Sequence, residues 1–148
     1  MRRSILIIVL IFSLLVSLKI GFNIAFKNDK TLRLEAEENV ELFQKEYNNN
    51  LLESVYEKTC KSFKNATSKE EFLAIMKGKK DVFGSFKNSD LLYSNVINSE
   101  VIVLNYRSTY VHYSLIEEYT YVKENKSRLC LKNFYIDDSG KRGEVIKL

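Results

Sequence analysis

The stretch that decides the fold runs from Val101 to Ile136 and reads VIVLNYRSTYVHYSLIEEYTYVKENKSRLCLKNFYI. It is crowded with Val, Ile, Leu, Tyr and Thr side chains, which suit the pleated, half-buried surface of a sheet. One polar break, from Glu124 to Ser127, contains an asparagine and separates two apolar runs, which is a hairpin signal. The stretch therefore predicts at least three antiparallel strands.

Four strands are expected once the residues before Val101 are included. Their expected bounds are Phe86 to Ile97, Val101 to Tyr113, Ile116 to Lys123 and Arg128 to Ile136. Asp137 to Gly140 reads as a terminating turn, and residues 141–148 read as a flexible tail.

A helix with one apolar face is expected from Lys30 to Tyr47. Its apolar residues recur every three or four positions, while acidic residues fill the other side as a solvated face. Asn48 to Asn50 interrupts this helix, because Asn side chains compete with the helical backbone for hydrogen bonds.

Two further helical segments are expected before the strands begin. The first of them turns Leu51, Leu52, Val55 and Tyr56 inward and has Cys60 and Phe63 near its end.

The spacing of Ser68 and Glu71 has the form of a capping box, which starts the last helix. That helix is expected to end by Gly78 or within Lys77 to Lys80. Helices followed by an antiparallel sheet make the α+β class, with the helices packed over one face of the sheet.

The N-terminus predicts a membrane anchor through residues 4–26. A helix from Ser4 to Phe26 rises roughly 34 Å, enough for a hydrocarbon core of about 30 Å, and Lys19 then reaches towards the outer interface. A cleaved signal peptide and a buried core helix stay open as alternatives, although the expected pair of small residues before a cleavage site is missing around Ala25.

Arg2 and Arg3 orient this segment by the positive-inside rule. We expect residues 1–27 to be a signal-anchor with a cytoplasmic N-terminus, and residues 28–140 to be an exported domain. The expected location is a bacterial cytoplasmic (inner) membrane, crossed once, with the C-terminal domain outside the cytoplasm.

The net charge of +4 belongs to the N-terminal segment. Residues 1–28 hold four of the 23 basic residues and no acidic residue, so the remainder carries 19 basic against 19 acidic residues. Nucleic-acid-binding domains keep a basic excess on the folded part, since neutralising phosphates supplies their affinity. The charge therefore argues against a nucleic-acid partner.

The order of elements resembles a known bacterial family. A helix, a polar break, a second helix, a Ser-x-x-Glu start, a Phe-Gly exit at Gly84, and a four-strand meander with Glu117-Glu118 and Leu-x-Leu-x-x-Phe resemble the "domain of unknown function 4019" family. That family is placed within the cystatin-like, nuclear-transport-factor-2-like cone fold. The resemblance covers about residues 30–137, and the chain departs from the family pattern at Leu129 and Phe134.

The resemblance implies export and a curved sheet with a pocket, and it implies no established chemistry. Relatives of this superfold include small isomerases and hydrolases that use His or Asp inside the cone. His112, the single histidine, is therefore the candidate residue for catalysis, with Glu117 or Glu118 as the acid that it needs. Such a residue is more often a hydrogen-bonded structural or surface residue, and the sequence predicts neither a metal site nor a cofactor.

The sequence leaves two interpretations of Cys60 and Cys130. In an exported domain they can form a disulfide, worth about 2–4 kcal/mol across such a loop, or they can be two small buried hydrophobic residues. If Leu129 and Leu131 face the helices, the bond requires Cys60 to pass around the edge of the sheet.

Tyrosine is the remaining feature of the strands. Exposed tyrosines are common at interfaces, because the ring is apolar and the hydroxyl stays wet, although strand preference also explains them. The ligand or partner face expected from the sequence comprises Tyr106, Tyr110, His112, Glu118 and Tyr121.

Together these features predict a membrane-anchored extracytoplasmic domain that acts as a non-catalytic binding or accessory module. Its expected partner is a protein of the cell envelope, and an immunity-type role against a secreted toxin is one version. The alternative is a ligand-binding or enzymatic cone with His112 in its pocket, because fold alone does not settle function.

Overall fold

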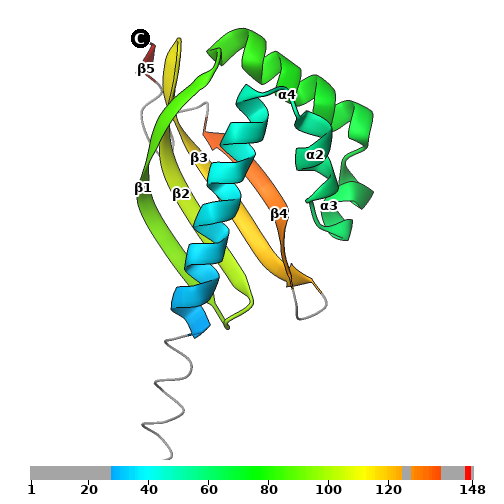
Figure 1. The fold of residues 1–148 in the computed structure, drawn as a ribbon, viewed down its shortest axis with the longest axis vertical. Helices are drawn as coiled ribbons and strands as arrows, with labels where there is room; N and C mark the ends of the chain where they lie inside the picture. The colour runs from blue at the N-terminus through cyan, green and yellow to red at the C-terminus, as the bar shows by residue number, and fades with distance from the viewer. Residues whose placement is uncertain (1–27, 125–127, 138–145, 148) are drawn as a thin grey trace, which may run out of the picture.

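The computed structural model describes residues 28–124, 128–137 and 146–147. Within these residues the chain forms two layers, an antiparallel sheet and a set of helices packed against it (Figure 1). The α+β class and the four-stranded antiparallel sheet expected from the sequence are confirmed. The expected membrane span, residues 4–26, lies outside the described residues.

Helices precede strands along the chain, as expected. The first helix covers residues 28–48 and is followed by α2 (Leu52–Glu57), α3 (Lys61–Ala66) and α4 (Lys69–Phe83). The strands are β1 (Phe86–Ile97), β2 (Val101–Tyr110), β3 (Tyr113–Glu124), β4 (Arg128–Asp137) and β5 (Ile146–Lys147).

The sheet has the order β1-β2-β3-β4, and every neighbouring pair is antiparallel. β5 pairs with the start of β3, so part of the expected tail forms a short strand. Register shifts interrupt β1 twice, between Phe86 and Asn88 and between Leu91 and Tyr93. β1 and β4 are the two edges of the four-strand order.

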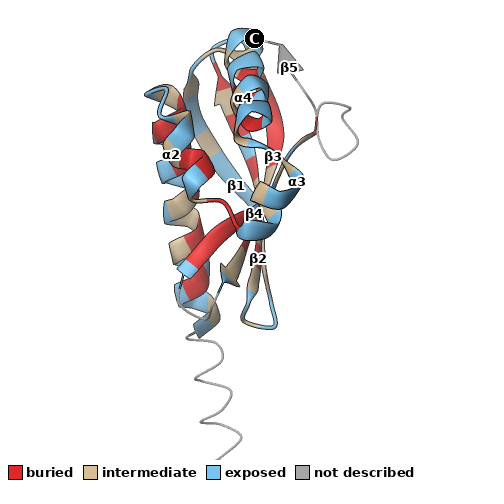
Figure 2. Ribbon diagram, turned by 90° about the vertical axis from the view of Figure 1, so that its right-hand side faces the viewer, coloured by how far each residue is buried: buried red, intermediate tan, exposed pale blue. Residues whose placement is uncertain are grey.

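The core lies between the first helix and the sheet (Figure 2). Side chains alternate between the two faces of a strand, and in β2 every second residue is buried. The matching stripe on the first helix recurs every three or four residues, which is the spacing of one helical face. The buried residues of these two elements are Leu32, Ala36, Val40, Phe43, Tyr47, Ile102, Leu104, Tyr106, Ser108 and Tyr110.

The first helix ends at the asparagine run, as expected. Asn50 has a φ of 60°, in the left-handed region that Asn tolerates better than most residues. Asn48 has a further role, because its side-chain Nδ2 donates to the Phe86 carbonyl at 2.9 Å and its Oδ1 accepts from the Phe86 amide at 2.8 Å. The end of the helix is thereby tied to the start of β1.

The second helical piece is two helices rather than one, which corrects the expectation for Cys60 and Phe63. Between α2 and α3 the chain runs beside β4, and Thr59 forms a parallel bridge with Leu131. The Cys60 amide donates to the Leu131 carbonyl at 2.9 Å. This pairing replaces helical hydrogen bonds, so α2 stops at Glu57 and α3 restarts after Cys60.

The capping box that starts α4 is confirmed, with the Ser68 hydroxyl accepting from the Glu71 amide at 3.2 Å. The end expected near Gly78 is wrong, because α4 continues to Phe83. A glycine inside a helix costs only about 1 kcal/mol relative to alanine, which the contacts of the last turn offset. Among them, Lys80 Nζ donates to the Tyr47 carbonyl at 3.1 Å.

The second strand is shorter than expected and the third begins earlier. β2 stops at Tyr110, and the turn that follows bonds back to the end of α4. The Val111 amide donates to the Ser85 carbonyl at 3.0 Å, and the His112 amide donates to the Phe83 carbonyl at 3.1 Å. His112 therefore lies in a turn rather than within a strand.

Gly84 and Gly78 should respond in opposite directions to alanine. Gly84 has a φ of 79° and a ψ of −159°, and an added Cβ would lie 2.9 Å from Val111 Cβ. We expect Gly84→Ala to lower the free energy of unfolding by about 1–3 kcal/mol, the usual cost of such a backbone conformation without glycine.

Gly78→Ala is the matched control. A Cβ at this helical position meets nothing within 4 Å, so we expect stabilisation by about 0.5–1 kcal/mol. Urea unfolding of the full chain and both variants, followed by circular dichroism, measures the two changes. Equal effects at both glycines would contradict this account of the α4 terminus.

Candidate functional site

The five residues that the sequence assigns to a ligand or partner face do not share one surface in the structure. Tyr106, Tyr110 and Tyr121 point towards the helices, with 8, 0 and 4 % of their surface exposed. Glu118 is half-buried, and its neighbour Glu117 is the residue that faces the helices. His112 is exposed in the turn between β2 and β3.

The difference arises from which face of the sheet the helices cover. Tyrosines occur on both faces of the sheet. The alternation along a strand assigns each tyrosine to one of two faces, but it does not show which face the helices cover. Tyr93 and Tyr135 are the exposed ones, with 54 and 43 % of their surface accessible. The expected partner face is therefore corrected, since three of its tyrosines belong to the core.

A buried ion pair lies between α4 and the sheet. Lys79 Nζ on α4 is 2.6 Å from Glu117 Oε1 on β3, and the two side chains are 2 and 0 % exposed. Lys79 occupies the apolar stripe of α4 with Phe72 and Met76, which are buried as well. Charged groups at such depth are retained only when they are paired and hydrogen-bonded.

Three more polar side chains donate hydrogen bonds to Glu117. Tyr110 Oη donates to Oε1 at 2.8 Å, and Tyr119 Oη donates to Oε2 at 3.0 Å. Gln44, from the first helix, donates through Nε2 to Oε2 at 3.0 Å. The carboxylate is thus held by donors from the first helix, α4, β2 and β3.

Aromatic rings surround the ammonium group of Lys79. Its Nζ lies 4.7 Å from the ring centres of Tyr47 and Tyr110 and 4.8 Å from that of Phe134. Cations are attracted to the negative face of such rings, and the attraction is larger where water is excluded. The rings therefore compensate in part for the lost hydration of Lys79.

Opposing effects act on the pKa values of this cluster. Burial alone would raise the pKa of Glu117, but the charge of Lys79 and the hydrogen bonds from Lys79 and Tyr110 hold it below 4.5. Burial lowers the pKa of Lys79, and the charge of Glu117 opposes that change. Burial and the nearby carboxylate raise the pKa of Tyr110 and Tyr119 well above 10.0, so both remain hydrogen-bond donors.

Sequence reasoning names Glu117 only as a possible acid beside His112, and it does not single out Lys79 or Gln44. The signal was present in the helical stripes, because Lys79 follows Phe72 and Met76 at steps of four and three. A lysine inside an apolar stripe indicates a buried partner of opposite charge.

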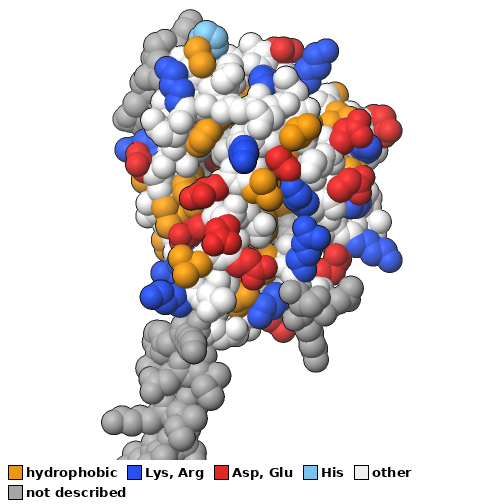
Figure 3. Space-filling view, in the orientation of Figure 1, with side chains coloured by type: hydrophobic (Ala, Val, Ile, Leu, Met, Phe, Trp, Pro, Cys, Tyr) orange, Lys and Arg blue, Asp and Glu red, His pale blue; other side chains and the backbone are white. Residues whose placement is uncertain are grey.

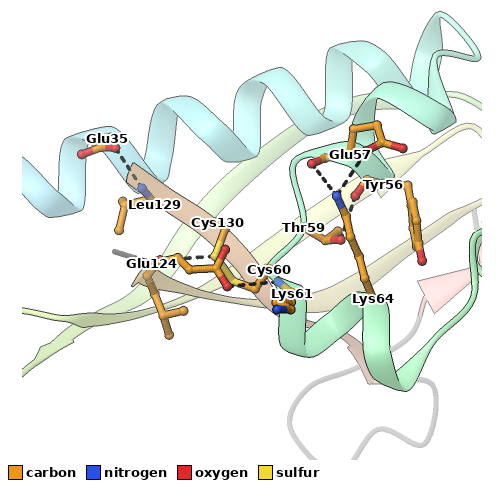
Figure 4. Close-up of a disulfide and its surroundings, with 11 residues drawn as sticks. Glu35, Tyr56, Glu57, Thr59, Cys60, Lys61, Lys64, Glu124, Leu129 and Cys130 are labelled. Carbon is orange, nitrogen blue, oxygen red and sulfur yellow. Dashed lines mark hydrogen bonds and ion pairs between the residues drawn. A yellow bond between two sulfur atoms is a disulfide. The ribbon is translucent and has the colours of Figure 1, made fainter. Parts of the chain in front are cut away.

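The two cysteines form a disulfide in the structure, from the segment after α2 to β4 (Figure 4). Their Cα atoms are 5.0 Å apart, within the range that permits the bond. If Leu129 and Leu131 face the helices, the bond requires Cys60 to pass around the edge of the sheet. This condition is met, because Thr59 and Cys60 run along the outer edge of β4. Cys60 thus reaches Cys130 around the edge of the sheet.

A groove of about 640 Å³ lies between the first helix and the start of β1. Its lining includes the apolar surfaces of Val40, Phe86 and Tyr106 and the polar side chains of Lys45 and Asn88. Burial, followed by the charges of two glutamates on the first helix, raises the pKa of Tyr106 to about 12, so its hydroxyl stays protonated. Neither Lys79 nor Glu117 lines this groove.

β1 adds an exposed apolar run beside this groove. Leu91, Leu92, Tyr93 and Ile97 have between 41 and 54 % of their surface accessible. In Figure 3 hydrophobic side chains gather along the margin that β1 forms, and acidic side chains cover the first helix. An apolar edge strand that faces water is uncommon in a stable monomer unless something covers it.

Metal and membrane sites are judged only for the part of the chain that the structure describes. There, no group of three His, Cys, Asp or Glu side chains is placed to hold a metal ion. Of the helices among the same residues, none has the length and hydropathy needed to span a bilayer.

Removing one partner of the buried ion pair should be costly. We expect Lys79→Met to lower the free energy of unfolding by about 3–5 kcal/mol, because Glu117 is left buried without its counter-charge. The double variant Lys79→Met/Glu117→Gln should recover part of this loss, since it contains no buried charge. Urea unfolding of the full chain measures both; a single-variant cost below about 1 kcal/mol would contradict the burial of the pair.

The same pair predicts a pH dependence. The pKa of Glu117 is lower in the folded state than the usual 4.5, so its contribution is present above pH 4.5 and is lost as the pH falls through the folded value. We expect the native chain to lose stability more steeply below pH 4.5 than Lys79→Met/Glu117→Gln. Parallel slopes for the two proteins in acid would be inconsistent with a charged Glu117.

The family of the chain stays a prediction. No family model, no curated protein and no solved structure matches it.

Proposed function

We propose that this chain is a membrane-anchored extracytoplasmic domain that acts as a non-catalytic binding or accessory module for a protein of the cell envelope. The disulfide between Cys60 and Cys130 supports the extracytoplasmic part of the proposal. Disulfides persist in oxidising compartments and are rare in the cytosol. The expected anchor at residues 4–26 accounts for delivery to that compartment.

The finer fold assignment is part of the same proposal. The helices pack on one face of a four-stranded antiparallel meander, an arrangement that a cystatin-like cone shares. The two register shifts in β1 favour a curved sheet, because bulges bend a strand and increase its twist.

One observation carries the binding function: β1 exposes apolar side chains along an edge of the sheet, whereas the charges of Lys79 and Glu117 are paired out of reach of solvent. Leu92 and Tyr93 are 48 and 54 % exposed. Lys79 and Glu117 are occupied by each other and by neutral donors. The accessible chemistry is that of recognition rather than proton transfer.

The alternative, a ligand-binding or enzymatic cone with His112 in its pocket, has less support. His112 is exposed in a turn, and it does not line the groove beside β1. Tyr106 does line that groove, so a small-ligand role remains the second candidate, carried by the groove and not by His112.

Chemical cross-linking in native membranes tests the binding function. We expect the tagged full chain to capture one envelope protein in stoichiometric amount, and His112→Ala to capture the same protein equally. The matched control is residues 1–27 fused to an unrelated exported domain, which should capture nothing comparable. Capture by the control as efficiently as by the full chain would assign the interaction to the anchor and contradict a binding role for the domain.

A further inference from the structure

The outer edge of β1 offers main-chain hydrogen bonds to a partner. Among the described residues β1 pairs with β2 alone, over registers from Phe86 to Ile97. A strand with a neighbour on one side carries amides and carbonyls that point away from the sheet on the other side. An extended polypeptide satisfies such groups by adding one more strand.

At Phe86, the first residue of β1, a side chain of the same chain takes the place that a partner strand would occupy. The Asn48 carboxamide donates to the Phe86 carbonyl at 2.9 Å and accepts from the Phe86 amide at 2.8 Å. These are the two bonds that a residue of a neighbouring antiparallel strand makes with its opposite residue. The side chain of Asn48 therefore marks the direction from which further peptide groups would approach.

The charge pattern of β1 specifies the kind of segment that fits. No charged residue occurs from Leu91 to Ile97, and the run lies between Asp90 and Glu100. Exposed edges are usually protected against unwanted pairing by lysine, proline or bulges. One register shift lies within this run, between Leu91 and Tyr93, but protection by charge is missing there, because the one lysine of the strand, Lys87, lies before it. An uncharged segment with apolar side chains matches Leu91–Ile97 without burying an unpaired charge.

The groove beside β1 gives this segment a second contact. It lies between the first helix and the first residues of β1, where Phe86 and Tyr106 contribute apolar surface. Its rim is polar, because it is also lined by Glu41, Lys45 and Lys87. Successive side chains of an added strand point to opposite faces of the sheet. Opposite Asn88 and Ser89, those on the helix side would enter the groove. Further along the strand, those on the other side would lie near Tyr93.

A second copy of this chain fits the edge less well than another protein does. Antiparallel pairing of two β1 edges requires a two-fold axis that turns one copy end over end. The start of the first helix lies beside the β1–β2 turn, where Ser99 Oγ donates to Asp29 Oδ1 at 2.6 Å. The two copies of residue 28 would then lie at opposite ends of the pair, whereas the expected anchors require them on the same side of one membrane.

We propose that the edge of β1 from Asn88 to Ile97 binds an extended, uncharged polypeptide segment of another protein as an additional strand. This inference rests on the proposed binding function and names the surface and the partner chemistry for it. Main-chain hydrogen bonds hold the segment, and Leu91, Leu92 and Tyr93 contact its apolar side chains.

A peptide library supplies the probe for this surface. Random twelve-residue peptides displayed on phage are selected on the full chain in phospholipid nanodiscs, after counter-selection on empty nanodiscs. We expect uncharged peptides whose affinity falls at least tenfold for Leu91→Lys and for Tyr93→Lys, because a charge on the edge opposes pairing. Ile75→Lys is the matched control, since Ile75 is 57 % exposed on α4, and its effect should stay below twofold.

Amide hydrogen exchange distinguishes main-chain pairing from side-chain contact, because only main-chain hydrogen bonds to the peptide protect the amides of β1. A bound peptide should slow amide exchange between Asn88 and Ile97, where new main-chain bonds form. Recovery of no peptide, equal binding to all three lysine variants, or protection confined to other segments would overturn the proposal. So would sedimentation that shows a dimer of the native chain which Tyr93→Lys dissociates, because the occupant would then be a second copy.

Failure here and failure of the binding function are distinguishable. An envelope protein captured in native membranes by the full chain, and equally by Tyr93→Lys, would keep the binding module and reject the β1 edge as its surface. Absence of that captured protein would reject the binding function itself.

Discussion

The ion pair between Lys79 and Glu117 determines how the layers of this domain fit together. Glu117 projects from a central strand and receives donors from the first helix, from α4 and from β2. An arrangement that withheld one of these donors would leave a buried charge undercompensated, which is among the largest single penalties in a protein interior. The polar cluster therefore links the position of both long helices to the register of the sheet.

The polar groups that bond to Glu117 and Lys79 in the core are not available at the surface. The hydroxyls of Tyr110 and Tyr119 and the amide of Gln44 serve the buried carboxylate, and the aromatic rings around Lys79 replace its water. Along Leu91–Ile97 of β1 the accessible surface is backbone and uncharged side chains, and a groove adjoins the start of the strand. Such a surface recognises shape and main chain more than it recognises charge.

Strand existence was predictable from this sequence because branched and aromatic residues alternate over long runs, and β1 has the expected bounds from Phe86 to Ile97. The end of α4 was not predictable. Gly78 by itself indicates a helix end, and the tertiary contacts that carry the helix past it cannot be seen in the sequence. The covered face of the sheet was not predictable either, because apolar residues and tyrosines occupy both faces. Lys79 could have been found, as a charge within an apolar helical stripe.

The two edge strands of the sheet, β1 and β4, differ in what lies beside them. Along β4, the bridge between Thr59 and Leu131 and the disulfide at Cys60 occupy part of the flank. Among the residues that the structure describes, the flank of β1 has the side chain of Asn48 at its first residue. The bridge at Leu131 divides the edge of β4, so within the described residues β1 is the edge that has no main-chain partner along its length. If the proposed pairing uses β1 alone, each domain accepts one added strand, which ends an assembly as a one-to-one complex instead of extending it into a fibre.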